Sequence, residues 1–307
     1  MRILVLGAGA IGGYFGGRLA AAGRDVTFLV RPARAALLAQ NGLHVHSPHG
    51  DFAVAAPTTV TADAVRDPYD LVILGAKGYD LDSAVDAIAP AVGPDTAVLP
   101  LLNGMRHIDV LDDRFGPEAV LGGTCLAPLV LRADGSIDHL GEPHTLTHGE
   151  LKGGTSARSS AIQEELTGAG FDAVESADIL QDMWEKWVFL ASAAGITSLM
   201  RAPVGDIVAA GGTALVEQLI AEVAGIAEEQ GRPPRAAALA QTRAGLTAPG
   251  SPMTASMMRD IDAGHRTEVD HIIGDLLARA GDRPVDLLRT VFVHVKTYEA
   301  RREREAG

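Results

Sequence analysis

Short apolar blocks alternate with helical patterns through the first half of the chain. Compact apolar runs predict strands at residues 2–6, 25–30, 70–76 and 95–102. Helical periodicity covers residues 11–22, with Gly23 as the expected C-terminal cap, and returns after the third strand in LDSAVDAIAPAV. Strands and helices that alternate in this way predict a parallel sheet covered by helices on both faces.

Two stretches depart from this alternation. Residues 43–54 have the pattern of a hairpin around HSPHGD. Residues 120–151 predict antiparallel strands with a turn at Ala133-Asp134-Gly135, and one more helix follows at residues 159–169.

After residue 175 the periodicity becomes helical. Helical patterns cover residues 179–200, 213–230 and 255–280, with at most one short strand near the C-terminus and a solvated, fraying end in ARREREAG. At 307 residues the chain is long for a single core. We expect an α/β fold of two domains: a Rossmann-type domain over residues 1–175 and an all-helical domain over residues 176–307.

Charge and composition limit the classes of molecule that the protein can be expected to bind. The formal net charge of −13 disfavours nucleic acid and anionic membranes, although one local basic site can still bind an anionic small molecule. No run approaches the about 20 apolar residues of a membrane span. The single cysteine, Cys125, allows no intrachain disulfide and fits a reducing compartment. We expect a cytoplasmic protein, with a homodimer as an open alternative.

Three histidines lie close together in HLGEPHTLTH: His139, His144 and His148. Their spacings match no helical or finger-type set of metal ligands. We therefore interpret them as surface or strand histidines and expect no metal.

Residues 7–12 form a G-x-G-x-x-G motif that follows a strand directly and opens a helix. In a dinucleotide-binding unit the first glycine makes the turn, the second admits the pyrophosphate and the third lets the helix pack on the strand. The helix N-terminus offers unpaired N–H groups to the phosphates. The expected cofactor contacts of this loop are Gly7, Ala8, Gly9, Ala10, Ile11 and Gly12.

The end of the second strand bears on the choice of dinucleotide. Sites for NAD place an acid there, which binds the ribose 2′-hydroxyl. This chain has Arg31 instead, with Arg34 beyond it, so the sequence favours NADP(H) through a contact to the 2′-phosphate. A plain surface arginine at a strand end is the alternative.

Both tryptophans of the chain flank Lys186, in DMWEKWVFL. The chain has only four lysines against twenty-two arginines, so a lysine here suggests a task that arginine cannot perform. A desolvated lysine can give up its proton near neutral pH, and Trp184 and Trp187 offer an apolar setting. Reduction of a ketone needs such an acid, because negative charge develops on the oxygen. The alternative is a helical ion pair with Asp182.

A serine, several acids and a bend come together in SMMRDIDAGHRTEVD, which begins at Ser256. The first helix of this segment should stop near Gly264. Residues 267–270 then have the form of a capping box, which would place Glu268 in the first turn of a new helix, where the dipole favours its charged form. An acid that merely stabilises the helix is the alternative.

Taken together, these residues resemble the ketopantoate reductase (2-dehydropantoate 2-reductase) family over nearly the whole chain. The resemblance rests on GAGAIGGYFG, Arg31, AKGYD, LLNGM, the WEKW helix and the spacing of Ser256, Asp260 and Glu268. It implies a Rossmann domain, a helical domain and NADPH-dependent reduction of a 2-oxo acid, with 2-dehydropantoate giving pantoate in pantothenate biosynthesis. It also implies these roles: Lys186 as proton donor, Glu268 beside the nicotinamide ribose and the reacting hydroxyl, Ser256 on the substrate carboxylate, Lys77 on the cofactor, and Asn103 on both cofactor and substrate.

The chain departs from the family at three positions. Well-matched members carry asparagines where this sequence has Leu190, Ala194 and Val204. Losing such hydrogen bonds changes specificity where a site was built around them. A paralogue that reduces a different, bulkier or more apolar, 2-oxo acid or ketone is therefore a rival. Arg201 could replace a carboxylate contact there, but a surface role is the favoured interpretation of this arginine.

Two further readings stay open. A dehydrogenase of the 3-hydroxyacid or 6-phosphogluconate type also joins a Rossmann unit to helices and uses a lysine, but the TEVD segment with Ser256 favours the first family. A non-catalytic NADP(H) sensor would have no need for the pair Lys186 and Glu268.

Overall fold

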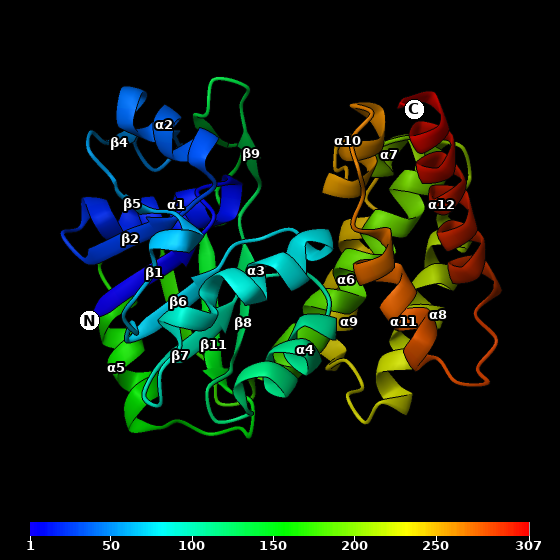
Figure 1. The fold of residues 1–307 in the computed structure, drawn as a ribbon. Coiled ribbons are helices and arrows are strands. Elements are labelled where there is room, and N and C mark those ends of the chain that lie inside the picture. The colour runs from blue at the N-terminus through cyan, green and yellow to red at the C-terminus, as the bar shows by residue number, and fades with distance from the viewer. Residues whose placement is uncertain (307) are drawn as a thin grey trace. The chain divides into compact units, whose positions relative to one another are not determined.

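The computed structural model describes residues 1–306, and these form two compact units (Figure 1). The first unit holds residues 1–102 and 107–180, and the second holds residues 103–106 and 181–307. The sequence placed the boundary at residue 175, where the last strand of the first unit ends; the units themselves change over inside the first turn of the next helix. Gly307, the last residue of ARREREAG, lies outside the described part.

A five-stranded parallel sheet forms the centre of the first unit, as expected. Its order is β5-β2-β1-β6-β7, and the innermost strand places Val5 beside Phe28 on one side and Ile73 on the other. The strands are β1 (Arg2–Leu6), β2 (Asp25–Leu29), β5 (Thr58–Val60), β6 (Leu71–Leu74) and β7 (Ala97–Pro100). The connecting elements are α1 (Ala10–Ala21), α2 (Pro32–Asn41), η1 (Ala62–Ala64), η2 (Gly78–Asp80), α3 (Leu81–Ile88), η3 (Ala89–Ala91) and α4 (Arg106–Phe115).

Two smaller sheets complete this unit, with orders β4-β3-β10-β9 and β12-β11-β8. Their elements are β3 (Leu43–His46), β4 (Phe52–Val54), β8 (Leu121–Leu126), β9 (Leu129–Leu131), β10 (Ile137–His139), β11 (Thr145–Glu150), α5 (Ala157–Leu166) and β12 (Asp172–Glu175). The predicted hairpins β3–β4 and β9–β10 are confirmed. The antiparallel expectation for residues 120–151 was incomplete, because β10 also pairs in parallel with β3 and β11 with β12.

Helix α1 lies between the parallel sheet and the β4-β3-β10-β9 sheet, and its glycines make this possible (Figure 1). A Cβ on Gly16 would come within 2.8 Å of the Phe28 ring, and one on Gly17 within 2.9 Å of Leu43. Side chains of both sheets therefore reach the backbone of the helix, and Phe28 and Leu43 are completely buried against it.

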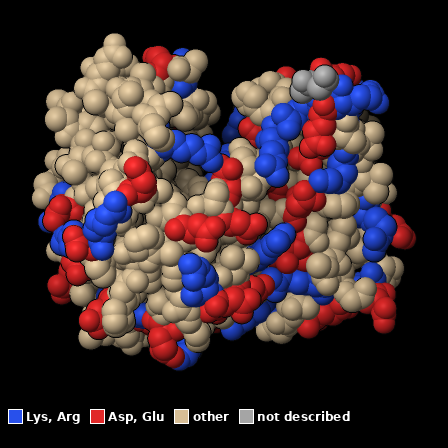
Figure 2. Space-filling model, viewed as in Figure 1, with Lys and Arg blue, Asp and Glu red and all other residues tan. Residues whose placement is uncertain are grey.

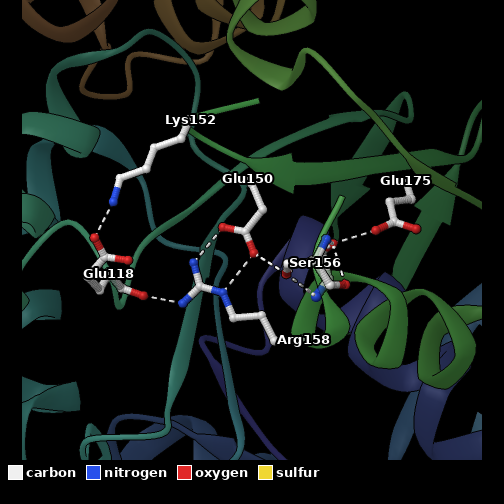
Figure 3. A network of polar contacts seen from close by, with 7 residues as sticks. Glu118, Glu150, Lys152, Ser156, Arg158 and Glu175 are labelled. Atoms are coloured by element: carbon white, nitrogen blue, oxygen red, sulfur yellow. Dashed lines mark hydrogen bonds and ion pairs between the residues drawn. The ribbon is translucent and has the colours of Figure 1, made fainter. Parts of the chain in front are cut away.

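A polar network fixes the start of α5 (Figure 3). Ser156 and Ser159 form a capping box, in which the Ser156 hydroxyl accepts from the Ser159 N–H at 3.1 Å. The same hydroxyl donates to Glu150 at 2.5 Å, and Arg158 binds both oxygens of Glu150 at 2.8 and 2.6 Å. These bonds attach the helix to the end of β11.

The second unit is helical, as predicted. Its elements are α6 (Ile179–Met200), α7 (Val204–Ala209), α8 (Thr213–Glu229), α9 (Ala236–Leu246), α10 (Ser256–Asp262), the π-helical segment η4 (Asp270–Gly274), α11 (Asp275–Arg279) and α12 (Asp286–Ala306). Helices α8 and α12 pack together, and Glu222 of α8 accepts the Leu287 and Leu288 N–H groups at the start of α12. The short C-terminal strand was wrong, because its residues lie in α12, which also continues through ARREREA.

Charge is mixed on the surface. Figure 2 shows Lys and Arg interspersed with Asp and Glu on the face in view. None of the helices within residues 1–306 combines the length and apolar character needed to cross a bilayer.

Candidate active site

The glycine loop has the geometry of a phosphate-binding turn. Gly7 adopts φ +84°, and its N–H donates to the Leu29 carbonyl at 2.9 Å, so the loop stays attached to β2. A Cβ on Gly12 would lie 2.0 Å from the Gly7 carbonyl oxygen, which only glycine avoids. A Cβ on Gly9 would meet nothing within 4 Å. The loop is thus closed against the protein at Gly12 and open at Gly9, which fits a dinucleotide pyrophosphate at the start of α1.

Ala8, Ala10 and Ile11 complete this loop. Arg34 of α2 donates to the Ala8 carbonyl through Nε at 3.0 Å and Nη2 at 2.7 Å. This arginine therefore holds the loop itself, and burial lowers its pKa. Ala10 and Ile11 form the first turn of α1.

Arg31 is the residue immediately before α2, and its side chain is 77% exposed. Its guanidinium pairs with Asp80 at 3.0 Å. Lys77 lies just before η2, the turn that carries Asp80, and the Asp80 N–H donates to the Lys77 carbonyl at 2.9 Å. The structure therefore brings Arg31 and the AKGYD segment to one place, beyond the carboxyl ends of β2 and β6.

In the second unit, Lys186 is half-buried on α6, between two buried tryptophans. The Trp184 and Trp187 rings pack on each other with centroids 4.9 Å apart. The Trp187 indole N–H donates to the Ile272 carbonyl of η4 at 2.9 Å. Asp182, the alternative partner of Lys186, is ion-paired with Arg235, which also binds Glu185.

Glu268 lies two residues before η4 and is only 6% exposed. Its carbonyl accepts the N–H groups of His271 and Ile272, at 3.0 and 2.9 Å, so it begins the helical segment. The indole of Trp187 binds that same Ile272, which joins the α6 turn of Lys186 directly to the segment of Glu268.

The expected capping box at Thr267 was wrong. The Thr267 hydroxyl donates to Glu299 of α12 at 2.6 Å, and the Thr267 N–H reaches the same oxygen at 3.2 Å. The acid three residues on, Asp270, binds Lys296 at 2.8 Å. Lys296 also binds Glu299 at 2.9 Å. The Thr267 hydroxyl still accepts the Val269 N–H at 3.4 Å, so a weak local cap remains, and a contact with α12 takes the place of the reciprocal bond from Asp270.

Asn103 follows β7 and belongs to the second unit. Its neighbour Gly104 has φ +81°, and a Cβ there would lie 2.8 Å from the His271 carbonyl oxygen. Burial lowers the pKa of His271, with the Arg106 charge acting in the same direction and the Glu268 charge against it. The turn that carries Asn103 therefore packs against His271, which follows Glu268 by three residues in sequence.

Ser256 starts α10, and the residue before it is bonded to α6: the Ala255 N–H reaches the Thr197 hydroxyl at 3.4 Å. Leu190 and Ala194 follow Lys186 at four-residue steps, so they lie on its face of α6 in the direction of Thr197. The Val204 N–H donates to the Met253 carbonyl at 3.0 Å, in the segment that leads to Ser256.

Ala194 and Val204 are both 1% exposed, and Leu190 is half-buried. The face of α6 between Lys186 and the start of α10 is therefore apolar. Arg201 adopts φ +53° and pairs with Asp262 on the surface.

Comparison with known proteins decides the family. The model "Ketopantoate reductase PanE/ApbA" matches residues 3–153, and "Ketopantoate reductase PanE/ApbA C terminal" matches residues 178–299. The chain belongs to the ketopantoate reductase family. It is therefore an oxidoreductase of a family that uses a nicotinamide cofactor.

Relatives of this ketopantoate reductase family member span its full length. "Uncharacterized oxidoreductase YkpB" of Bacillus subtilis is 35% identical and covers 98% of this chain and 99% of its own. A "2-dehydropantoate 2-reductase" of Mesorhizobium japonicum is 30% identical over 96% of this chain and 97% of its own. The crystal structure of 2-dehydropantoate 2-reductase from Geobacter metallireducens, 28% identical, matches with a TM-score of 0.88 over 97% of this chain and 99% of that one.

D-mandelate dehydrogenase with NADH and anilino(oxo)acetate is 21% identical, with a TM-score of 0.87 over 99% of this chain and 100% of that one. At this identity the likeness shows the fold alone.

Sequence reasoning about this family member missed three contributors to the site. Glu299 gave no local signal, since it lies in a charged helix far from Glu268 in sequence. The role of Trp187 as a hydrogen-bond donor depends on a carbonyl 85 residues away. Asp80 stood within the AKGYD motif, but only the fold brings it to Arg31.

Proposed function

We propose that this protein uses NADPH to reduce a 2-oxo acid to a 2-hydroxy acid, with 2-dehydropantoate as the first substrate to test. The observation that carries the proposal is the bond from Trp187 to Ile272, which holds the Lys186 turn against the Glu268 segment. One lysine and one buried acid are thereby kept in a fixed relation within a single helical unit. We further propose that the reaction takes place in the cytoplasm and serves pantothenate biosynthesis.

NADPH, when bound, supplies the hydride to the carbonyl carbon. The carbonyl oxygen then gains negative charge and requires a proton, which Lys186 donates from Nζ. Lys186 lies on the apolar face of α6, where little water competes for that oxygen. The lysine recovers its proton from solvent after the hydroxy acid leaves.

The remaining residues bind and orient. Glu268, held at the start of η4, accepts a hydrogen bond from the nicotinamide ribose and from the hydroxyl that forms. Ser256, at the start of α10, donates to the substrate carboxylate. Asn103 contacts both cofactor and substrate, and Lys77 contacts the cofactor.

Arg31 supports NADPH over NADH. An exposed guanidinium just past β2 suits a 2′-phosphate, and Asp80 holds it there when no phosphate is bound. The loop residues Gly7, Ala8, Gly9, Ala10, Ile11 and Gly12 hold the pyrophosphate through backbone N–H groups.

The test is NADPH oxidation with 2-dehydropantoate, followed at 340 nm, for wild type, Lys186→Ala and Lys152→Ala. Lys152 is an exposed lysine of the first unit and serves as the control. We expect kcat to fall at least about a hundredfold in Lys186→Ala, the usual contribution of a general acid, and to stay unchanged in Lys152→Ala. NADPH affinity, measured by fluorescence, should remain in both. Activity that survives in Lys186→Ala would reject the assignment. A wild type that binds NADPH but consumes no substrate would favour the sensor reading.

A second candidate substrate is a more apolar 2-oxo acid. Leu190, Ala194 and Val204 offer no polar group to a hydroxylated substrate. A panel that compares 2-dehydropantoate with branched and aromatic 2-oxo acids separates the two candidates through kcat/KM. A preference for 2-dehydropantoate would remove the second candidate.

A further inference from the structure

We propose that His49, His139 and His144 form a binding site for a divalent transition metal such as Zn²⁺. One nitrogen of each ring lies within 4.8 Å of one nitrogen of each of the others. The proposal concerns the first unit alone and does not depend on the proposed reductase function. The spacing of His139, His144 and His148 in sequence predicted no metal, but that argument could not include His49, which comes from a distant hairpin.

The three rings come from separate segments that the fold brings together. His49 lies in the loop between β3 and β4, His139 ends β10, and His144 directly precedes β11. The His49 and His144 rings are stacked with centroids 3.7 Å apart, and the His139 ring lies 5.7 and 5.8 Å from them. His148 of β11, which the sequence grouped with them, is bonded to Gln163 of α5 at 3.1 Å and takes no part.

Two hydrogen bonds fix which nitrogen of each ring can bind a metal. His49 Nε2 lies 2.7 Å from the Glu142 carbonyl, and His139 Nε2 lies 2.9 Å from the Pro143 carbonyl. A carbonyl only accepts, so both Nε2 atoms carry the hydrogen and both Nδ1 atoms carry the lone pair. Metal-binding histidines typically donate their second N–H to a carbonyl or another acceptor in this way.

His144 has the complementary arrangement. Its Nδ1 lies 3.0 Å from the Tyr14 hydroxyl oxygen, which can accept from Nδ1–H and leave the lone pair on Nε2. His139 and His144 are 5% and 8% exposed, and burial favours the neutral ring that binds metals. The side chain of His49 is 31% exposed and gives access from solvent.

Binding requires a rearrangement in which the stacked His49 and His144 rings separate, because a bound metal lies in the plane of each ring that ligates it. Zn–N bonds of about 2.0–2.1 Å in a tetrahedral site place ligand nitrogens roughly 3.3 Å apart, closer than the 4.8 Å limit found here. The exposed His49 ring can turn to close this gap. The Ser47 hydroxyl, 3.0 Å from His139 Nδ1, must turn away. Arg18, which is bonded to Ser47 at 3.2 Å, opposes a cation and limits the affinity.

The fourth ligand would be water, because the Glu142 carboxylate lies 3.7 Å from His49 Nε2, on the side of the ring away from the ligating Nδ1. A metal there would join the β3–β4 loop to the turn between β10 and β11. We therefore expect a structural rather than a catalytic ion.

The test uses the full chain without a histidine tag, treated with EDTA and then titrated with ZnCl₂ in a calorimeter. The variants are His49→Ala, Tyr14→Phe and His44→Ala. His44 is an exposed histidine of the same small sheet, whose ring is bonded to the Asn41 carbonyl, and it serves as the control. Expected are one zinc per chain in wild type and in His44→Ala, loss of binding in His49→Ala, and affinity reduced about tenfold or more in Tyr14→Phe.

Thermal unfolding provides the second measurement. Zinc should raise the melting temperature of wild type and His44→Ala but not of His49→Ala, while all three melt alike in EDTA. Equal binding by His49→Ala and His44→Ala would show adventitious surface binding and overturn the proposal. The absence of any saturable zinc site in the wild type would overturn it as well.

Discussion

Replacing Glu299 with glutamine should loosen the segment that carries Glu268. The Glu299 carboxylate is 7% exposed and accepts three hydrogen bonds: two from Thr267, at 3.2 and 2.6 Å, and one from Lys296 at 2.9 Å. Glutamine keeps one acceptor oxygen, and its amide N–H groups cannot accept from the lysine. Glu299→Gln therefore loses at least one bond to a charged group.

The expected cost is about 2 kcal/mol of unfolding free energy, within the roughly 1.5–3 kcal/mol range for a hydrogen bond to a charged group. The larger cost of breaking a buried ion pair does not apply, because Lys296 keeps its bond to Asp270 at 2.8 Å and is 39% exposed. Glu303→Gln, an exposed change on the same helix, should cost nothing measurable.

Urea unfolding followed by tryptophan fluorescence measures this cost selectively. Both tryptophans of the chain lie in α6, so their emission reports the second unit alone. If Lys186 and Glu268 act as proposed, kcat should also fall in Glu299→Gln while KM for NADPH changes less. Equal unfolding curves for Glu299→Gln and Glu303→Gln would refute the reasoning.

The loss of unfolding free energy in Glu299→Gln should depend on pH. Burial raises the pKa of Glu299, but the bonds from Thr267 and Lys296 outweigh it, so the folded pKa lies below its ordinary value. A group with a depressed folded pKa stabilises the protein above its unfolded pKa, and that contribution is lost as the pH falls through the folded value. The difference between wild type and Glu299→Gln should therefore be full at neutral pH and shrink in acid.

Three further substitutions test other parts of the molecule. Arg31→Ala should raise KM for NADPH at least about tenfold, because it removes a charged phosphate contact worth roughly 1.5–3 kcal/mol, and should leave KM for NADH unchanged. Arg66→Ala, which changes another exposed arginine, is the control. Equal effects of Arg31→Ala on both cofactors would contradict the 2′-phosphate assignment. Trp187→Phe should lower the unfolding free energy of the second unit by about 1–3 kcal/mol more than Trp184→Phe in urea unfolding, because Trp187 donates to the buried Ile272 carbonyl. Equal losses of unfolding free energy in the two variants would show that this bond does not stabilise the unit. Ser156→Ala should cost about 1 kcal/mol in unfolding followed by circular dichroism, and an unchanged midpoint would show that the capping box contributes nothing.

Local patterns predicted those features that local forces determine. The glycine loop and α6 follow from neighbouring residues, and α6 spans the expected residues 179–200. The short strand allowed for near the C-terminus did not form, although this region holds VFVHV, whose valines are β-branched and favour strands in isolation. In the fold these residues lie in α12, whose packing against α8 overrides that preference.

The candidate site shows the same division. Lys186 and Glu268 stood out by residue type and setting, but the contact that relates them runs through Trp187 and Ile272. The capping box at Thr267 is incomplete because a distant carboxylate, Glu299, accepts the Thr267 N–H that the acid of the box would have bound. Pairings between residues tens of positions apart leave no trace in a local pattern.

The turn at residues 103–106 makes the helical unit discontinuous in sequence. A gene fragment that begins at Gln181 would encode nearly all of α6 and every later helix, yet it would lack the piece of chain that packs on His271. Cutting the gene at residue 175 would have the same defect. Domain dissection of this protein therefore calls for a graft of the 103–106 turn or a circular permutation, rather than a simple truncation.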